Sequence, residues 1–106
     1  MKRAEVWWVQ FGPSVGSEIK KERPAVIVSN DAANQFLSRV QVVPLTSSTS
    51  KLYPSEAYVS VKGKRSKAMA DQLTTVSKAR LTNKAGTLSS SDMENVARAI
   101  AIQLDL

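Results

Sequence analysis

The sequence contains no histidine and no cysteine, and these two absences exclude much of the usual chemistry of small enzymes. Without cysteine there is no disulfide, no thiolate nucleophile and no zinc–thiolate cluster. Without histidine there is no imidazole acid–base pair, and most transition-metal sites lose their commonest ligand. No apolar run approaches the roughly 18 residues of a membrane span, and no secretory leader pattern follows the first residues. These features predict a cytoplasmic protein without a cofactor and without membrane contact.

What the chain does contain is an excess of positive charge. The 106 residues fit a single domain, residues 1–106, and carry 15 Lys and Arg against 9 Asp and Glu, a net charge of +6. An apolar fraction of 42% argues against disorder. A small basic domain favours a polyanionic partner, either nucleic acid or an acidic protein, although a basic surface without such a partner has the same composition.

Strand-like patterns dominate the first four fifths of the chain. Aromatic and β-branched runs predict strands over residues 5–11, 24–28, 39–45, 57–61 and 68–76. A short sixth strand is expected over residues 80–82, with Gly86 stopping it. One helical turn is expected over residues 31–36, with Asn30 or Asp31 as its cap.

The last segment has the pattern of an amphipathic helix that covers the sheet. Ser91 and Glu94 have the spacing of a capping box at its start. Several short strands followed by one terminal helix indicate a small β-barrel or a strongly bent sheet. The predicted apolar stripe of the helix consists of Met93, Val96, Ala97, Ile100 and Leu104.

Two of the predicted strands have polar residues at one end that suit a phosphate site: Arg23 precedes one strand and Thr46 follows the other. Residues 23–31 read RPAVIVSND, and residues 40–48 read VQVVPLTSS. Arginine keeps its charge and binds phosphate through a planar fork, and a threonine hydroxyl both donates and accepts hydrogen bonds. If the two strands pair, Arg23 and Thr46 lie near one another at one edge of the sheet.

Residues 62–84 form a basic stretch whose only acid is Asp71. Such a stretch attracts nucleic acid by neutralising phosphates, or it is a solvated edge that prevents sheet-to-sheet aggregation. Its seven basic side chains are Lys62, Lys64, Arg65, Lys67, Lys78, Arg80 and Lys84.

Three further features each allow a functional and a structural interpretation. Trp7 and Trp8 are adjacent and point to opposite faces of a strand, so one belongs to the core and the other is a stacking platform or an interface contact. Asp71 could act as a base, contact a ribose or form an ion pair. Gly16 either lets the backbone approach a ligand closely or simply makes a turn.

In order and spacing, these motifs resemble the MazF/PemK/Kid toxins of bacterial toxin–antitoxin systems. The resemblance covers nearly the whole chain. It rests on the tryptophan pair, on GSE at residues 16–18, RPAVIVSN at 23–30, PLTS at 44–47, DQL at 71–73 and KARL at 78–81, and on the terminal helix.

The resemblance implies a mainly β (α+β) fold, an SH3-like small β-barrel with a C-terminal helix of the CcdB/MazF/Kid type. It also implies a homodimeric mRNA interferase, which is an endoribonuclease. The toxin would cut single-stranded RNA at short sequences without a metal, leaving a 2′,3′-cyclic phosphate and a 5′-hydroxyl. A cognate acidic, MazE-like antitoxin would neutralise it.

Residue by residue, the family's catalytic positions fall on Arg23 and Thr46. One branch of the family also uses an arginine two residues before the aspartate of the DQ motif, but Met69 stands there, so the arginine–threonine mechanism fits better. The expected substrate-binding residues are Gly16, Ser17, Glu18, Lys20, Ser47, Lys51, Asp71 and Gln72.

Two alternatives remain open on the same barrel. A CcdB-like toxin binds DNA gyrase and does not cut RNA, and it would not need Arg23. A plain RNA-binding barrel would use the basic stretch alone.

Overall fold

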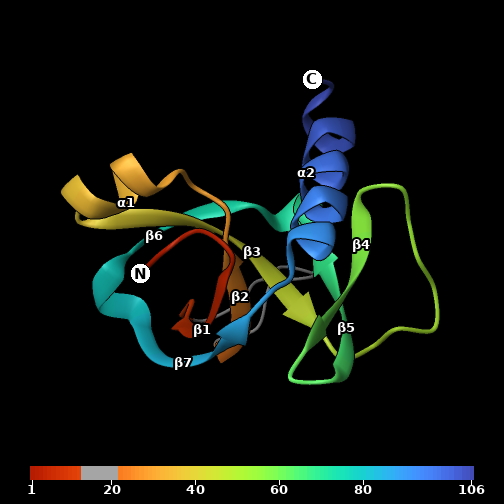
Figure 1. Ribbon diagram of the computed structural model, residues 1–106, viewed down its shortest axis with the longest axis horizontal. Helices are drawn as coiled ribbons and strands as arrows, with labels where there is room; N and C mark the ends of the chain where they lie inside the picture. The colour runs from red at the N-terminus through yellow and green to blue at the C-terminus, as the bar shows by residue number, and fades with distance from the viewer. Residues whose placement is uncertain (13–21) are drawn as a thin grey trace.

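A bent antiparallel sheet forms the body of the computed structural model, which describes residues 1–12 and 22–106 (Figure 1). The strand order is β4-β5-β3-β2-β1-β7, and β6 pairs with β3 off this path. The strands are β1 (Glu5–Gln10), β2 (Glu22–Ile27), β3 (Arg39–Thr46), β4 (Glu56–Val61), β5 (Lys64–Met69), β6 (Thr74–Ser77) and β7 (Leu81–Thr87), with helices α1 (Asp31–Phe36) and α2 (Ser90–Leu104) and the short 3-10 turns η1 (Ala70–Gln72) and η2 (Lys78–Arg80).

The long strand β3 gives the sheet its bend. Its first half pairs with β6, its middle pairs with β2, and its last two residues pair with β5. The β4–β5 hairpin therefore turns away from the plane of β1, β2 and β7, as Figure 1 shows. The result is the predicted mainly-β, SH3-like barrel with a C-terminal helix.

Alternating side chains bury both faces of the central strands. Val26 and Val43 pack in one core together with Val96 of α2, whereas Ile27 and Val42 pack in a second core on the opposite face. A period of two along a strand places neighbours on opposite faces, so the two cores follow directly from continuous apolar runs in β2 and β3.

Some element boundaries predicted from the sequence are wrong. The run over residues 68–76 is not one strand, because η1 interrupts it between β5 and β6. Strand β7 extends to Thr87 and passes through Gly86, which faces β4; a Cβ there would lie 3.0 Å from Val61 Cγ1. Gly86 therefore allows a close approach of strands and does not end one.

Helix α2 is present as predicted, but its cap and its buried stripe differ from the prediction. Ser89 caps the helix by accepting from the backbone N–H of Asp92, so the expected capping box of Ser91 and Glu94 is wrong. Ala99 is buried whereas Ala97 and Leu104 are exposed.

The short helix α1 follows its prediction closely. It begins at Asp31, with Asn30 as the cap that accepts from the backbone N–H of Ala33 at 2.8 Å.

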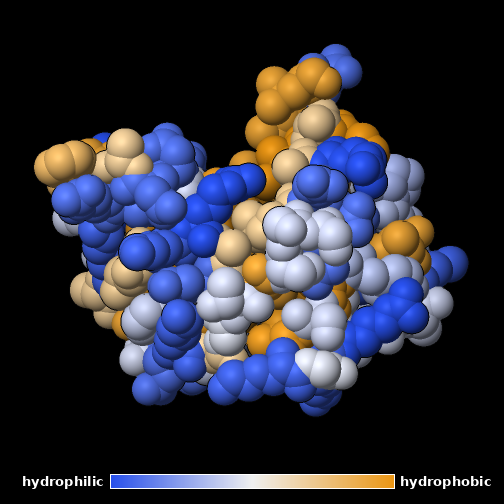
Figure 2. Space-filling model, viewed as in Figure 1, coloured by the Kyte–Doolittle hydropathy of each residue, from blue (hydrophilic) through white to orange (hydrophobic). Residues whose placement is uncertain are grey.

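Apolar side chains gather at the free end of α2. Its last turn extends beyond the sheet, and Figure 2 shows the apolar surface there. Ile102, Leu104 and Leu106 are all exposed. No helix in the described ranges has the length and apolarity to span a membrane.

Candidate active site

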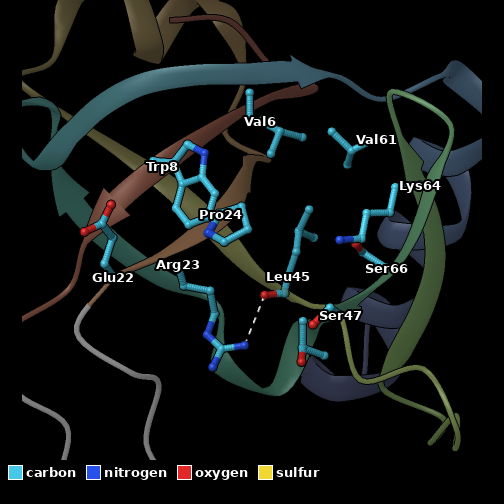
Figure 3. Close-up of a pocket in the computed structure, with 12 residues that line it drawn as sticks. Val6, Trp8, Glu22, Arg23, Pro24, Leu45, Ser47, Val61, Lys64 and Ser66 are labelled. Atoms are coloured by element: carbon cyan, nitrogen blue, oxygen red, sulfur yellow. Dashed lines mark hydrogen bonds between the residues drawn. The ribbon is translucent and has the colours of Figure 1, made fainter.

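A pocket of about 340 Å³ opens between the β1–β2 strands and the β4–β5 hairpin (Figure 3). It contains Arg23 and Thr46, the two residues to which the family resemblance assigns catalysis. Its lining consists of Val6, Trp8, Glu22, Arg23, Pro24, Leu45, Thr46, Ser47, Val61, Lys64, Ser66 and Ala85.

Arg23 reaches the pocket from the start of β2. Its backbone is opposite Val9 of β1, and its half-buried side chain donates from Nη1 to the carbonyl oxygen of Leu45 at 3.2 Å. Figure 3 shows the guanidinium on the same side of the pocket as Ser47. The Nε atom of Arg23 is buried and has no hydrogen-bond partner among the described residues. The guanidinium is thus tethered at one corner and keeps donors for an incoming anion.

Thr46 is the last residue of β3, and strand pairing brings it to the same edge. Ala25 is opposite Pro44 in the antiparallel β2–β3 ladder. Arg23 lies two residues before Ala25 and Thr46 two residues after Pro44, so the same register brings the two residues to one edge of the sheet. The Oγ1 atom of Thr46 accepts from the backbone N–H of Ser48 at 3.2 Å. Because a hydroxyl both accepts and donates, its own proton remains available to a ligand. The predicted convergence of the two strand ends is therefore confirmed.

Two walls of the pocket come from residues that sequence reasoning did not assign to it. Trp8 is 40% exposed and faces the pocket, while Lys64 and Ser66 line the opposite wall on β5 (Figure 3). Trp7 turns to the other face, where its Nε1 donates to Glu5 at 3.0 Å, as the alternation predicts. Only the exposed member of the tryptophan pair is free to stack on a base. No motif in the sequence indicated that Ser66 would line a pocket.

The other predicted substrate-binding residues lie elsewhere. Ser47 is exposed and lines the pocket, but Lys51, Asp71 and Gln72 do not line it. Asp71 and Gln72 belong to η1, which packs near α2. The remaining four residues, Gly16, Ser17, Glu18 and Lys20, lie outside the described residues.

The basic stretch does not form one patch. Lys84 pairs with Glu5 at 3.3 Å, and the guanidinium of Arg65 stacks 3.6 Å above the ring of Tyr58. Lys67 is buried in an ion pair. Of the seven basic residues, only Lys64 lines the pocket. Three of these side chains are thus engaged in contacts within the protein, and the phosphate-binding interpretation stays open for Lys64.

Two carboxylates, at the first residue of β1 and the first residue of α1, have pKa values below their ordinary values. Burial raises the pKa of Glu5, but hydrogen bonds from Trp7, the Lys2 backbone and Lys84 outweigh burial and lower it. Asp31 accepts from the backbone N–H of Arg3 at 2.7 Å, and this bond is the largest cause of its lowered pKa. Neither carboxylate lines the pocket. Within residues 1–12 and 22–106, no group of three acidic side chains gathers as a metal site would require.

The chain is similar in sequence to known toxins along nearly its whole length. The family model described as "PemK-like, MazF-like toxin of type II toxin-antitoxin system" matches residues 2–104. Endoribonuclease MazF9 of Mycobacterium tuberculosis is 36% identical over 115 residues, covering 100% of this chain and 98% of the relative. Endoribonuclease EndoA of Bacillus subtilis is 31% identical over 112 residues, covering 100% of this chain and 96% of the relative.

Solved structures share the same architecture. An endoribonuclease in complex with its cognate antitoxin, from a mycobacterial species, matches with a TM-score of 0.84 at 25% identity, covering 100% of this chain and 96% of that one. MazF from Deinococcus radiodurans matches with a TM-score of 0.85 at 23% identity, covering 100% and 97%. The likeness therefore extends over the entire sheet and its terminal helix.

Proposed function

This chain belongs to the PemK-like, MazF-like toxins of type II toxin–antitoxin systems, and we propose that it cuts single-stranded RNA through attack of a ribose 2′-hydroxyl on the neighbouring phosphorus. It is an endoribonuclease, as its named relatives are. The chemistry of the cut is the part that we add.

The observation that carries the proposal is the position of Arg23 beside Thr46. A guanidinium bonded to the Leu45 carbonyl shares one pocket with a threonine hydroxyl, and its buried Nε has no hydrogen-bond partner among the described residues. A phosphate in this pocket would meet a planar fork of N–H groups and a hydroxyl donor. Arginine and hydroxyl donors fixed before the reaction stabilise negative charge without having to reorganise.

In the proposed reaction, the 2′-oxygen forms a bond to phosphorus and loses its proton. The bond between phosphorus and the 5′-oxygen breaks, and that oxygen gains a proton. The products are a 2′,3′-cyclic phosphate and a 5′-hydroxyl. Negative charge builds on the phosphoryl oxygens, and Arg23 and Thr46 stabilise it; donors of this kind are worth about 10²–10³ in rate each. Arg23 stabilises the charge and does not carry the proton, because guanidinium keeps its proton in proteins.

The lining also suits a nucleotide next to the cut. Trp8 offers an exposed aromatic face, and stacking on aromatic side chains is how proteins commonly hold unpaired bases. Lys64 lies on the opposite wall, where an ammonium can neutralise an adjacent phosphate. Ser47 and the residues that lie outside the described part, Gly16, Ser17, Glu18 and Lys20, remain proposed RNA contacts.

The proposal includes an acidic antitoxin and a second copy of the chain. The mycobacterial endoribonuclease that matches this fold is bound to its cognate antitoxin. We propose that this chain is likewise neutralised by an antitoxin, an acidic, MazE-like protein for which a net charge of +6 is complementary. We also propose that it acts as a homodimer.

The test is incubation of the purified protein with single-stranded RNA in excess EDTA. Defined fragments with cyclic phosphate ends are expected, because no step requires a metal ion. Intact RNA with a mobility shift would indicate a plain RNA-binding barrel, and gyrase inhibition without fragments would indicate CcdB-like action. Either outcome would contradict the proposal.

A further inference from the structure

Lys67, in the middle of β5, is a buried lysine. Its residue is 7% exposed, whereas lysine is almost never fully buried unless it is paired. Its Nζ donates to Glu56 Oε1 at 2.9 Å and to the carbonyl oxygen of Lys51. The side chains of the Lys67–Glu56 pair are 8% and 10% exposed. Burying both charges is costly, so the arrangement needs an explanation beyond packing.

The pairing of strands places Lys67 in a row with Thr46. Strand β5 lies between β3 and β4, and Lys67 is directly opposite Thr46 on one side and Tyr58 on the other. Residues directly opposite in antiparallel strands lie on the same face. Glu56 is opposite Met69, two residues from Lys67, and so belongs to that face too. The buried ion pair is therefore next to the candidate catalytic hydroxyl across the ladder.

The chain that follows Thr46 folds back over this same face and is held there by hydrogen bonds. This is the loop of residues 47–55, which joins β3 to β4. Tyr58 donates from its hydroxyl to the Thr49 carbonyl at 2.9 Å, and Lys67 donates to the Lys51 carbonyl. Glu56 accepts from the backbone N–H of Tyr53 at 2.9 Å.

The anchored loop begins at the pocket. It begins with Ser47, which lines the pocket, and Ser48, whose N–H donates to Thr46 Oγ1 at 3.2 Å. Lys67 is the centre of the anchoring, since its ammonium joins the middle of the loop to Glu56. Removing that ammonium would free the Lys51 carbonyl and leave Glu56 buried without its cation.

We propose that Lys67 is a positioning residue for RNA cleavage: by holding the 47–55 loop through Lys51 and Glu56, it fixes Ser47 and the Thr46 hydroxyl toward the scissile phosphate. Lys67 does not itself touch the substrate. The inference rests on the proposed function, since it assigns a role in that reaction. A buried ion pair is weak evidence for stability, and a single fixed loop arrangement accounts for its presence better.

The test compares four variants of the full chain. Lys67→Met removes the ammonium and keeps most of the stem, and Lys67→Arg keeps the charge. The double variant Lys67→Met/Glu56→Gln leaves neither charge unpaired. The matched control is Lys84→Met, because Lys84 pairs with Glu5 at 3.3 Å on an exposed face and its loss changes the net charge equally.

Two measurements separate positioning from stability. One is amide hydrogen exchange over residues 47–53 in the absence of RNA. The other is the division between kcat and KM on a synthetic RNA that carries the cut site mapped with wild type. We expect Lys67→Met to raise loop exchange and to lower kcat by about 10–100-fold, since small displacements of catalytic groups cost that much. The change in KM should be smaller. Lys67→Arg should recover part of the loss.

The double variant is decisive. It should regain thermal stability relative to Lys67→Met and still show a low kcat and fast loop exchange, whereas Lys84→Met should match wild type in kcat and in loop exchange. Cleavage that returns with stability in the double variant would overturn the proposal. So would unchanged loop exchange or cleavage within about twofold of wild type in folded Lys67→Met, a margin far below the expected effect. Failure of the wild type to cut RNA would instead refute the proposed function, and loop exchange would still test the anchoring.

Discussion

Arg23 combines a fixed position with unused hydrogen-bond donors. One corner of its guanidinium is bonded to the Leu45 carbonyl, and its buried Nε has no partner among the described residues. Leaving a buried donor unsatisfied costs about 1–3 kcal/mol, so a phosphate that satisfies Nε recovers energy as it binds. In the proposed reaction, the Nε of Arg23 would therefore be one of the contacts to the phosphate.

Replacing Arg23 by lysine tests the planar fork separately from the charge. Lysine keeps the cation but presents a single ammonium, so it cannot hold Leu45 and two phosphate oxygens in one plane. We expect Arg23→Lys to lower kcat by about 10²–10³, as measured by single-turnover cleavage. Arg98→Lys is the matched control, because Arg98 is exposed on α2 and bonds only Asn95 among the described residues. Cleavage by Arg23→Lys at the control's rate would show that charge alone suffices.

Glu5 predicts how stability depends on pH. Burial raises the pKa of Glu5, but hydrogen bonds from Trp7, the Lys2 backbone and Lys84 hold it below the ordinary value of 4.5. The unfolded chain therefore binds the proton more tightly, and the stability that Glu5 contributes is complete above pH 4.5. It is lost as the pH falls through the lower folded-state value.

Urea unfolding as a function of pH measures this contribution. Wild type should lose stability between about pH 5 and pH 3, and Glu5→Gln should lose less over that interval. Asp31 contributes to the acid loss with the same sign, since its pKa is also lowered, and it remains in both proteins. Equal slopes for the two proteins would contradict the role of Glu5.

At the scale of elements, α2 closes one core, and its first turn depends on a serine. Ser89 accepts from the Asp92 N–H at 3.1 Å, and Asp92 in turn accepts from the Ser60 N–H at 2.9 Å on β4. The cap therefore fixes both the start of the helix and its attachment to the sheet.

Substitution of two neighbouring serines separates this cap from the capping box that the sequence suggested. Ser89→Ala should destabilise the protein by about 1 kcal/mol, whereas Ser91→Ala should change stability by no more than about 0.5 kcal/mol, as is usual for surface positions. Thermal melting of both variants provides the measurement. A larger loss for Ser91→Ala than for Ser89→Ala would restore the original assignment.

The elements that the sequence predicted well are those with a strong local pattern. The apolar runs of β2 and β3 predicted buried strands, and Asn30 predicted the start of α1. The failures have non-local causes. Gly86 is explained by Val61 across the fold, and it is Ser89, two residues before the predicted Ser91, whose side chain accepts from the N–H of Asp92.

The residues of the candidate site also divide into those with a local sequence pattern and those whose position depends on distant contacts. Arg23 and Thr46 could be predicted because each marks the end of an apolar strand, and pairing of the strands brings such ends together. Lys67 was grouped with a basic stretch because its partner Glu56 is 11 residues away and only the β4–β5 hairpin brings them into contact. A lysine between Ser66 and Ala68 gives no local signal of burial.

At the scale of the molecule, a net charge of +6 is expected to govern RNA capture more than the chemical step. Binding that neutralises phosphates weakens as salt rises. Accordingly, kcat/KM should fall steeply with added salt, while kcat at saturating RNA should change little. A salt effect confined to kcat would contradict this division.

Lys64 should account for part of the salt dependence, because it lines the pocket. We expect Lys64→Met to reduce the slope of log kcat/KM against log salt by about 0.7–1, the amount for one phosphate contact. Lys84→Met, with the same change of net charge away from the pocket, should leave the slope unchanged. Equal slopes for the two variants would mean that Lys64 makes no phosphate contact.

Six strands contribute side chains to one pocket, where we propose that Arg23 and Thr46 contact a scissile phosphate. The most direct test is an RNA that carries a single 2′-deoxynucleotide on the 5′ side of the mapped cut, compared with the all-ribose strand in EDTA. We expect the all-ribose strand to be cut to a 2′,3′-cyclic phosphate and a 5′-hydroxyl and the substituted strand to stay intact at that site. Cleavage of the substituted strand at the same bond would contradict attack by the 2′-hydroxyl.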